Sequence, residues 1–390
     1  MDPVIAFNPP WTHVISPLQQ RGNAEEVEAK VTEIVDSKRG CLITGWAGTG
    51  KTHFVKALCN RLGGATTKLA PTNMACLLLG GRTFHSTFGI NCETQNYSVG
   101  LLKTYGNVSN VVVDEVSMVT FLEWHLLDLI KRTWNPRIFL VGDFEQCEPV
   151  NEGSKKEHNY REHYLIKSLA DSQYMELNIN QRSDDRMWNL VRRLLQDGDD
   201  LTGADGIQIY SPDSSTQPVI WKHLAHSNEV RIKINHMCVE KWIKAKPLYK
   251  SIFMEGMGPP KHKQDYRITV GMPIISVVNN PKLKIVNNEQ FTVLSISDRI
   301  ITLKRINDVP PEVGPKVEVL LTKFAPQFDV AFCITVHRSQ GSTYKEPYVI
   351  WQWKTMGGPF ANARRRRRLR YTALTRTSET NHVFIALGEP

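Results

Sequence analysis

The sequence lacks the features that mark secreted, zinc-binding or membrane-spanning proteins. Its seven cysteines lie far apart, with no C-x-x-C pair and no Cys/His ligand spacing, so reduced thiols are expected and a zinc site is not. The first residues contain neither a basic segment nor an apolar core, so no secretory signal is expected. No apolar run approaches the ~20 residues of a membrane span. We therefore expect a cytoplasmic or nuclear-type reducing compartment, with no secretion and no membrane partner.

The composition is that of an ordinary globular protein. Hydrophobic residues make up 41% and charged residues 22% of the 390 residues, which argues against a fibrous or disordered chain. The length suits two or three domains. The net charge of +9 favours a polyanionic partner such as a nucleic acid, although many basic proteins act on small molecules. No internal repeat is present, and the arginine run at 364–368 is the only biased segment.

The amino-terminal half predicts alternating strands and helices. A helix is expected at 52–62, where Gly63 and Gly64 can end it. Such alternation is typical of an α/β fold, in which a parallel sheet has helices on both faces and binds ligands at the carboxyl ends of its strands. The expected strands are 41–45, 66–70, 110–115 and 137–143.

The second half predicts two kinds of sheet. Between 266 and 322 apolar and polar residues alternate and are interrupted by Asn, Asp, Pro and Gly, which indicates short antiparallel strands. We interpret this stretch as a small β-barrel inserted in a second lobe. A polar connector at 151–164 precedes that lobe. The strands expected in its main sheet are 217–221, 329–335, 346–352 and 382–387.

Residues 45–52 read GWAGTGKT and fit the phosphate-binding pattern G-x-x-x-x-G-K-[ST]. The glycines allow backbone N–H groups to face phosphates, while Lys51 reaches the β- and γ-oxygens and Thr52 binds Mg²⁺. The motif follows a predicted strand and opens a predicted helix, which is the context of a working site. It identifies a nucleoside triphosphate as the substrate but not the process that hydrolysis drives. The loop residues expected to bind nucleotide are Gly45, Trp46, Ala47, Gly48, Thr49, Gly50, Lys51 and Thr52.

Two polar segments that follow predicted strands supply the rest of a hydrolytic site. Asp114 is placed to hold Mg²⁺ through water, and Glu115 beside it can polarise the attacking water. Gln146 can sense the γ-phosphate, because a neutral amide both donates and accepts hydrogen bonds. Alone, either segment would be an ordinary strand end. Downstream of a phosphate loop, the catalytic interpretation is favoured.

Seven segments in order resemble the helicases of superfamily one, class B, which include RecD, the phage helicase Dda and the petite-integration-frequency DNA helicases. The resemblance spans roughly residues 40–390 and is specific, because many of its words are close to those of the family. It implies two RecA-like lobes with ATP in the cleft between them. Besides the phosphate loop GWAGTGKT, the six other segments are LAPTNMACLLLGGRTFHSTFGI, VVVDEVSM, VGDFEQCEPV, NINQRSDD, AFCITVHRSQGSTYKEPYVI and RLRYTALTRTS.

The resemblance also implies how the chain is divided. Lobe one would be 1–175, with a strand-separating β-hairpin inserted at about 90–108. Lobe two would be 176–265 and 323–390, and the barrel at 266–322 would be its insertion, with NNE at 287–289 in place of the usual Asn-Gly-Glu. Arg182 and Arg376 of lobe two would stabilise charge on the γ-phosphate, although from composition alone each would be a surface charge. Gln340 and Gly341 would also contact the nucleotide.

Members of this family use ATP and Mg²⁺ to move 5′ to 3′ on single-stranded DNA and to unwind the duplex ahead. The resemblance therefore implies single-stranded DNA and single-strand/duplex junctions as partners, with a monomer as the working unit. Hydroxyls and imidazoles can hold phosphates without reading bases, and aromatic rings can stack on bases. The residues expected to contact the strand are Pro71, Thr72, Phe84, His85, Phe88, Asn228, Thr335, His337 and Ser339.

Several alternatives stay open. Gln19 or Gln20 stands where the family has an adenine-reading glutamine, but the flanking pattern is poor, so the choice of ATP over GTP is not settled. The run at 364–368 is either a localisation signal or, as we favour, a basic helix beside the nucleotide or DNA cleft. An RNA helicase of the same superfamily is one alternative function. A nucleic-acid-binding accessory ATPase subunit without unwinding activity is another. Replication, repair and recombination are equally compatible with the sequence.

Overall fold

The computed structural model describes residues 10–91, 94, 96–98, 100, 103–149, 160–198, 207–211, 219–256, 264–306, 314–359, 361–386 and 388. The chain forms two compact units, Met1–Ser183 and Asp184–Pro390. Each unit has its own parallel sheet, which confirms the expected α/β class. The units are divided after Ser183 and not at 175/176, because β7 (Gln173–Leu177) pairs with β2 in the first sheet.

The first unit is built on a seven-stranded sheet in the order β1-β7-β2-β6-β5-β3-β4, with every pair parallel. The expected strands at 41–45 and 66–70 are confirmed. The next two end earlier than expected, at Val113 and Gly142, so Asp114, Glu115 and Asp143 follow the strands directly. Besides β7, the strands are β1 (His13–Ile15), β2 (Cys41–Gly45), β3 (Thr66–Ala70), β4 (Arg82–Thr83), β5 (Asn110–Val113) and β6 (Arg137–Gly142).

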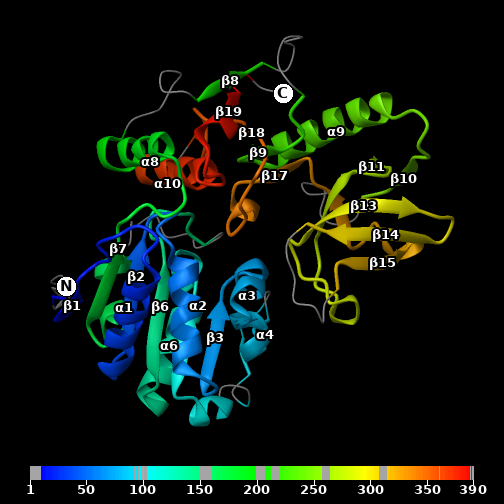
Figure 1. Ribbon diagram of the computed structural model, residues 1–390. Helices are drawn as coiled ribbons and strands as arrows, with labels where there is room; N and C mark the ends of the chain where they lie inside the picture. Colours follow the sequence, from blue (N-terminus) through cyan, green and yellow to red (C-terminus); the bar gives the residue numbers. More distant parts are fainter. Residues whose placement is uncertain are drawn as a thin grey trace, which may run out of the picture. The chain divides into compact units, whose positions relative to one another are not determined.

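Helices cover both faces of this sheet (Figure 1). Side chains alternate between the faces along each strand, so Leu42 belongs to the same core cluster as Leu127 of α6, while the next residue, Ile43, belongs to the cluster that contains Phe54 of α2. A reciprocal pair of hydrogen bonds between Thr120 and Glu123 fixes the start of α6. The helices are α1 (Ala24–Asp36), α2 (Lys51–Leu62), α3 (Asn73–Leu79), α4 (Phe84–Phe88), α6 (Phe121–Trp134) and α7 (Tyr164–Leu169).

Two expected features of the first unit lie partly outside the described residues. In the stretch at about 90–108, the described residues form no strand, and Lys103–Asn107 is a 3₁₀ helix. Within the same stretch, Ser98 N donates a hydrogen bond to Phe88 O at 2.8 Å. Of the connector at 151–164, residues 151–159 are outside the described part, and a 3₁₀ turn at Tyr160–Glu162 leads into α7.

The second unit contains a parallel sheet in the order β17-β9-β18-β19-β8. Of the strand expected at 217–221, residues 217 and 218 lie outside the described part, and Val219 is exposed. The nearest strand is β9, because pairing with a neighbouring strand begins only at His223, although Ile220 is already buried. The strands are β8 (Gln208–Tyr210), β9 (His223–Ala225), β17 (Cys333–Thr335), β18 (Tyr348–Ile350) and β19 (Val383–Ala386). The helices are α8 (Asp185–Arg192), continued by a π-helical turn at Arg193–Asp197, α9 (Asn228–Ala245) and α10 (Ala363–Leu374).

An antiparallel sheet in the order β15-β14-β13-β12-β16 makes up the rest of the second unit. It includes β16, just beyond the expected insertion, and β15 and β16 are its two edges. Asn288 has φ +68°, a conformation that suits glycine and that asparagine tolerates, where the family has Gly. The strands are β12 (Pro273–Ser276), β13 (Gln290–Ile296), β14 (Ile300–Arg305), β15 (Lys316–Leu320) and β16 (Phe328–Val330). A separate pair is β10 (Ile252–Met254) with β11 (Tyr266–Ile268).

In the part of the chain that the structure describes, no helix combines the length and the apolar character needed to cross a bilayer.

Candidate functional site

The phosphate loop joins the carboxyl end of β2 to the start of α2. Gly48 and Gly50 have φ of +89° and +90°, values that favour glycine. A Cβ on Gly45 would collide with the carbonyl oxygen of Leu177, so this position also requires glycine. The three glycines therefore shape the turn that aims the first N–H groups of α2, which have no partners within the helix, at a bound anion.

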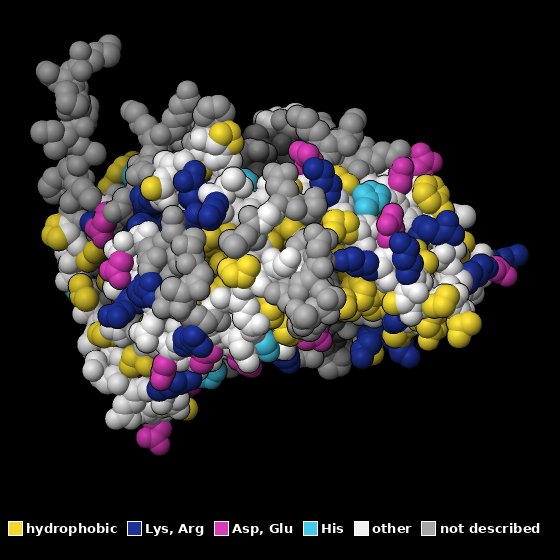
Figure 2. All heavy atoms as spheres, turned by 90° about the horizontal axis from the view of Figure 1, so that it is seen from above, with side chains coloured by type: hydrophobic (Ala, Val, Ile, Leu, Met, Phe, Trp, Pro, Cys, Tyr) yellow, Lys and Arg dark blue, Asp and Glu magenta, His cyan; other side chains and the backbone are white. Residues whose placement is uncertain are grey.

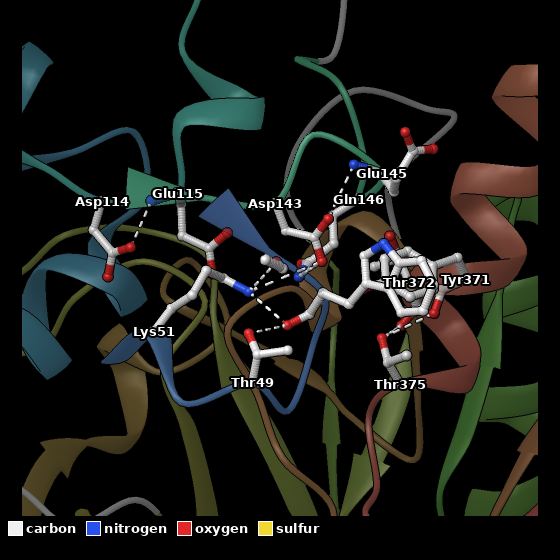
Figure 3. A network of polar contacts seen from close by, with 12 residues as sticks. Thr49, Lys51, Asp114, Glu115, Asp143, Glu145, Gln146, Tyr371, Thr372 and Thr375 are labelled. Carbon is white, nitrogen blue, oxygen red and sulfur yellow. Dashed lines mark hydrogen bonds and ion pairs between the residues drawn. The ribbon is translucent and has the colours of Figure 1, made fainter. Parts of the chain in front are cut away.

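The ammonium group of Lys51 lies inside this loop. Its Nζ donates hydrogen bonds to Gly45 O (2.6 Å) and Trp46 O (2.9 Å), and it lies 4.0 Å from Asp143 Oδ2. Figure 3 shows the Lys51 and Asp143 side chains pointing toward one another. Because both hydrogen bonds of the ammonium go to neutral carbonyls, a charged phosphate oxygen is a stronger acceptor for it.

Asp114 and Glu115 form a tight turn after β5. The Asp114 carboxylate accepts a hydrogen bond from Glu115 N (2.8 Å), and Glu115 has φ +53°, which is unusual for a residue with a side chain. A Cβ on Gly142 would lie 2.8 Å from Val116 N, so the turn packs directly on β6. Burial, followed by the negative charge of Glu115, raises the pKa of Asp114 to about 7. Two adjacent carboxylates in this setting favour a bound cation.

Asp143 and Gln146 complete the polar group at this edge of the sheet. The Asp143 carboxylate accepts hydrogen bonds from Glu145 N (3.0 Å) and from Gln146 Nε2 (3.2 Å). Gln146 is buried, and its Oε1 has no hydrogen-bond partner among the described residues. The amide is therefore oriented by Asp143 and keeps an acceptor available for water or substrate. The sequence predicted no catalytic role for Asp143, although it lies at the carboxyl end of a predicted strand, where such sheets bind ligands.

The residues proposed for Mg²⁺ fit the chemistry of that ion. Thr52 is exposed at the start of α2, and Asp114 supplies a carboxylate, so both donors are oxygens. Among the described residues, no group of three or more His, Cys, Asp or Glu side chains is arranged as a metal cage. Mg²⁺ typically uses one or two protein ligands together with substrate phosphates and water, and this donor set matches that habit.

The resemblance had implied that Arg182 belongs to the second lobe, but it lies in the first unit. The reason is local: the turn at 180–183 packs on the phosphate loop. A Cβ on Gly48 would lie 3.2 Å from Ser183 Oγ and 3.7 Å from Arg182 Cβ. The Arg182 side chain is exposed.

Arg376 lies in the second unit, where it is buried and fully engaged. Its guanidinium donates to Thr372 O (2.7 Å), Ser339 O (3.0 Å), Ser342 O (3.3 Å) and Thr375 Oγ1 (3.2 Å). Figure 3 shows Thr372 and Thr375 with their neighbour Tyr371 on the same helix end. Arg376 thus clamps the turn that contains Gln340 and Gly341, so the three expected nucleotide residues of this unit are brought together.

The expected DNA contacts of the first unit divide into two groups. Pro71 and Thr72 are partly exposed at the end of β3, where Thr72 Oγ1 accepts Ala75 N at 3.2 Å and caps α3. His85 is 38% exposed, with Nδ1 3.6 Å from the buried carboxylate of Glu123. Phe84 and Phe88 were expected to stack on bases. Both side chains have 0% exposure and belong to the hydrophobic core, which contradicts that expectation.

In the second unit, His337 and Asn228 are the accessible candidates. His337 is half-buried, and its ring centroid lies 6.5 Å from that of His226, a neighbour that the sequence motifs did not identify. Asn228 Oδ1 accepts a hydrogen bond from Arg231 Nε at 3.0 Å. The amide N–H₂ of Asn228 is therefore the group that can donate to a DNA strand.

The other two expected contacts of this unit are less suited to DNA. Ser339 has 0% exposure and donates its hydroxyl to Val336 O at 2.8 Å, so the expectation that it contacts DNA is contradicted. Thr335 is nearly buried, and its Oγ1 accepts Arg338 N at 3.4 Å.

His337 predicts an acid-sensitive contribution to stability. Burial, followed by the positive charges of His226 and Arg365, lowers the pKa of His337 from 6.5 to about 4. The unfolded chain therefore binds this proton more readily than the folded chain. The stabilisation is fully present above pH ~6.5 and is lost as the pH falls toward ~4. We expect His337→Asn to lose less thermal stability than the parent protein between pH 7 and pH 5, measured by calorimetry.

A matched control for this experiment is His236→Asn, because His236 is exposed on α9. Buried His223, whose pKa is lowered to about 3 by burial, adds the same acid sensitivity to every variant. Equal losses of melting temperature in His337→Asn and the parent protein would contradict the prediction.

Two family models match the chain in order. Residues 20–188 match the PIF1-like helicase model, and residues 330–384 match the UvrD-like helicase C-terminal domain. The ATP-dependent DNA helicase Pif1 of Bdellovibrio bacteriovorus is 23% identical over 371 residues, which cover 81% of this chain and 79% of that protein. The ATP-dependent DNA helicase PIF7 of Trypanosoma brucei brucei is 34% identical over 146 residues, but these are 32% of this chain and only 15% of that protein.

Solved structures share the fold over nearly the whole chain. Bacteroides Pif1 bound to single-stranded DNA has a TM-score of 0.64 at 19% identity, covering 94% of this chain and 93% of that one. A structure of two coordinating Pif1 helicases at forked double-stranded DNA has a TM-score of 0.63 at 18% identity, covering 94% and 92%. The PIF1-like helicase model over residues 20–188, a relative matched over most of its length and a shared fold around a complete phosphate loop together support the PIF1-like helicases of superfamily one, class B, as the family that this chain resembles.

Proposed function

We propose that the chain is an ATP-dependent DNA helicase that moves 5′ to 3′ on single-stranded DNA and unwinds the duplex ahead. The observation that carries this proposal is the polar group at the carboxyl edge of the first sheet. There the Lys51 ammonium lies inside a glycine-shaped loop, close to Asp143 and next to the Asp114–Glu115 turn. This arrangement suits phosphoryl transfer from a nucleoside triphosphate to water.

Each residue of the site has a proposed role in hydrolysis. The loop N–H groups and Lys51 would bind the β- and γ-phosphates, and Thr52 and Asp114 would hold Mg²⁺, which neutralises charge on the phosphates when bound. Glu115 would accept a proton from the attacking water, whose position the Gln146 amide would help to set. Arg182 and Arg376 would stabilise the charge that spreads over the γ-phosphate oxygens.

DNA would be held through its backbone. The partly exposed Pro71, Thr72 and His85 are the proposed contacts of the first unit, and Asn228 and His337 are those of the second. Figure 2 shows Lys and Arg side chains mixed with Asp and Glu over the visible face, not gathered into a single patch. We expect binding to depend on these few placed groups as well as on the net charge of +9.

The proposal includes a monomer in a reducing compartment. The described cysteines are all buried free thiols, which suits that environment. A second copy acting at a fork is the alternative to a monomer. Sedimentation of the protein on a forked duplex, with and without ATP, distinguishes one bound copy from two.

The polarity and the strand preference are tested together with tailed duplexes. With ATP and Mg²⁺, we expect unwinding of duplexes that carry a 5′ single-stranded DNA tail and none of those with a 3′ tail, because class B helicases move toward the 3′ end. Matched RNA tails are expected to support little unwinding and little stimulation of ATP hydrolysis. Unwinding from the 3′ tail alone would reject the polarity, and equal use of RNA would reject the restriction to DNA.

A further inference from the structure

A short turn next to the phosphate loop holds Gln181 in place. Gln181 N donates a hydrogen bond to Gly48 O at 2.8 Å, so the backbone of the turn is bonded to the backbone of the loop. A Cβ on Gly50 would lie 3.3 Å from Gln181 Cγ, so the side chain also packs over the loop. Any shift of the loop therefore moves this turn as well.

The Gln181 side chain is tied at its far end to a segment distant in sequence. Its Oε1 accepts a hydrogen bond from Gly22 N at 2.7 Å. The segment around Gly22 is itself ordered, because the Glu26 carboxylate accepts hydrogen bonds from Gln19 N (2.6 Å) and Gln20 N (3.1 Å). Gln181 therefore spans two fixed points, the phosphate loop and the turn that precedes α1.

Arg182 is the next residue, and its backbone is held from the other side. Asn180 Oδ1 accepts hydrogen bonds from Arg182 N (3.2 Å) and Ser183 N (2.9 Å), and Asn180 Nδ2 donates to Ser183 O (2.7 Å). The main chain of Arg182 is thus fixed on the loop while its side chain stays exposed. A guanidinium stabilises a transferring phosphoryl group only if it is placed well, and an error of ~1 Å can cost ~10²-fold in rate.

We propose that Gln181 is a positioning residue for Arg182. The backbone N–H of Gln181 donates to Gly48 O, and its side-chain oxygen accepts from Gly22 N. These two hydrogen bonds set where the Arg182 guanidinium meets the γ-phosphate of a nucleoside triphosphate in the loop. This inference rests on the proposed function, since it requires Arg182 to act on bound nucleotide. Gln181 itself need not touch the nucleotide.

A double-mutant cycle tests the proposal. Gln181→Met keeps the length of the side chain but removes the acceptor for Gly22 N–H. We expect it to lower kcat for ATP, at saturating single-stranded DNA, by about tenfold, the effect of losing one hydrogen bond. Arg182→Ala is expected to lower kcat by at least ~10²-fold. The kcat of the double variant should equal that of Arg182→Ala within about twofold. If Gln181 acts only by placing the Arg182 guanidinium, its replacement has no further effect once that guanidinium has been removed.

The controls separate positioning from a merely structural role. Gln208→Met makes the same chemical change at an exposed position of the second unit and should keep the kcat of the parent protein. If the two single substitutions lower kcat independently, their effects multiply in the double variant. That result would overturn the proposal, even if Gln181→Met also lowers the melting temperature. An unchanged kcat in either single variant would overturn it too. Absence of DNA-stimulated ATP hydrolysis in the parent protein would instead reject the proposed function.

Discussion

Replacing Lys51 by Ala is expected to abolish ATP hydrolysis and DNA unwinding together. The substitution removes the only ammonium group that the described structure places inside the phosphate loop, 2.6 Å from Gly45 O and 2.9 Å from Trp46 O. Without that charge, the γ-phosphate loses a charge-assisted hydrogen bond in the transition state. Loss of a single such donor typically costs ~10²–10³-fold in kcat. Hydrolysis is measured as phosphate release with saturating DNA, and unwinding on a 5′-tailed duplex.

The matched control is Lys56→Ala, since Lys56 lies on the same helix with its side chain exposed. It removes the same charge five positions along α2 and should leave both activities close to those of the parent protein. Binding to single-stranded DNA without nucleotide should survive in both variants, because Lys51 belongs to the nucleotide loop. Turnover of ATP by Lys51→Ala at the parent rate would mean that this loop is not the hydrolytic site.

The features that the sequence predicted well are those fixed by neighbouring residues. The phosphate loop is local: its glycines and Lys51 are consecutive, and β2 and α2 adjoin it. Asp114 and Glu115 follow an apolar run whose burial in the centre of the sheet is plain from its composition. The turn at 287–289 forms without a glycine, because Asn288 takes a φ of +68°, which asparagine tolerates.

What the sequence could not show depends on distant partners. Phe84 and Phe88 stand in a segment with polar neighbours, and only packing against Tyr105 and the helix α6 decides that both rings are buried. The end of the first unit depends on the pairing of β7 with β2, two strands separated by most of that unit. Apolar content alone did not distinguish exposed Val219 from the true strand that begins at His223.

Replacing Arg376 by Lys is expected to lower the melting temperature and the kcat for ATP nearly as much as removing the side chain would. Lysine keeps the positive charge, but one ammonium cannot reach Thr372 O, Ser339 O, Ser342 O and Thr375 Oγ1 as the planar guanidinium does. A buried carbonyl left without its donor costs ~1–3 kcal/mol. In a unit of this size, each kcal/mol lowers the melting temperature by about 2–4 °C. We therefore expect a fall of several degrees together with a loss of ~10²-fold or more in kcat.

The two effects have separate causes and can be separated by experiment. The fall in melting temperature follows from the clamp on the turn that contains Gln340 and Gly341, whereas the loss of kcat requires that the guanidinium also serve the γ-phosphate. Arg299→Lys, at an exposed position of the same unit, is the control for the exchange itself and should change neither quantity. If Arg376→Lys melts several degrees lower but hydrolyses ATP at the parent rate, Arg376 is a structural clamp alone. The charge on the γ-phosphate must then be stabilised by Arg182 and Lys51 without it.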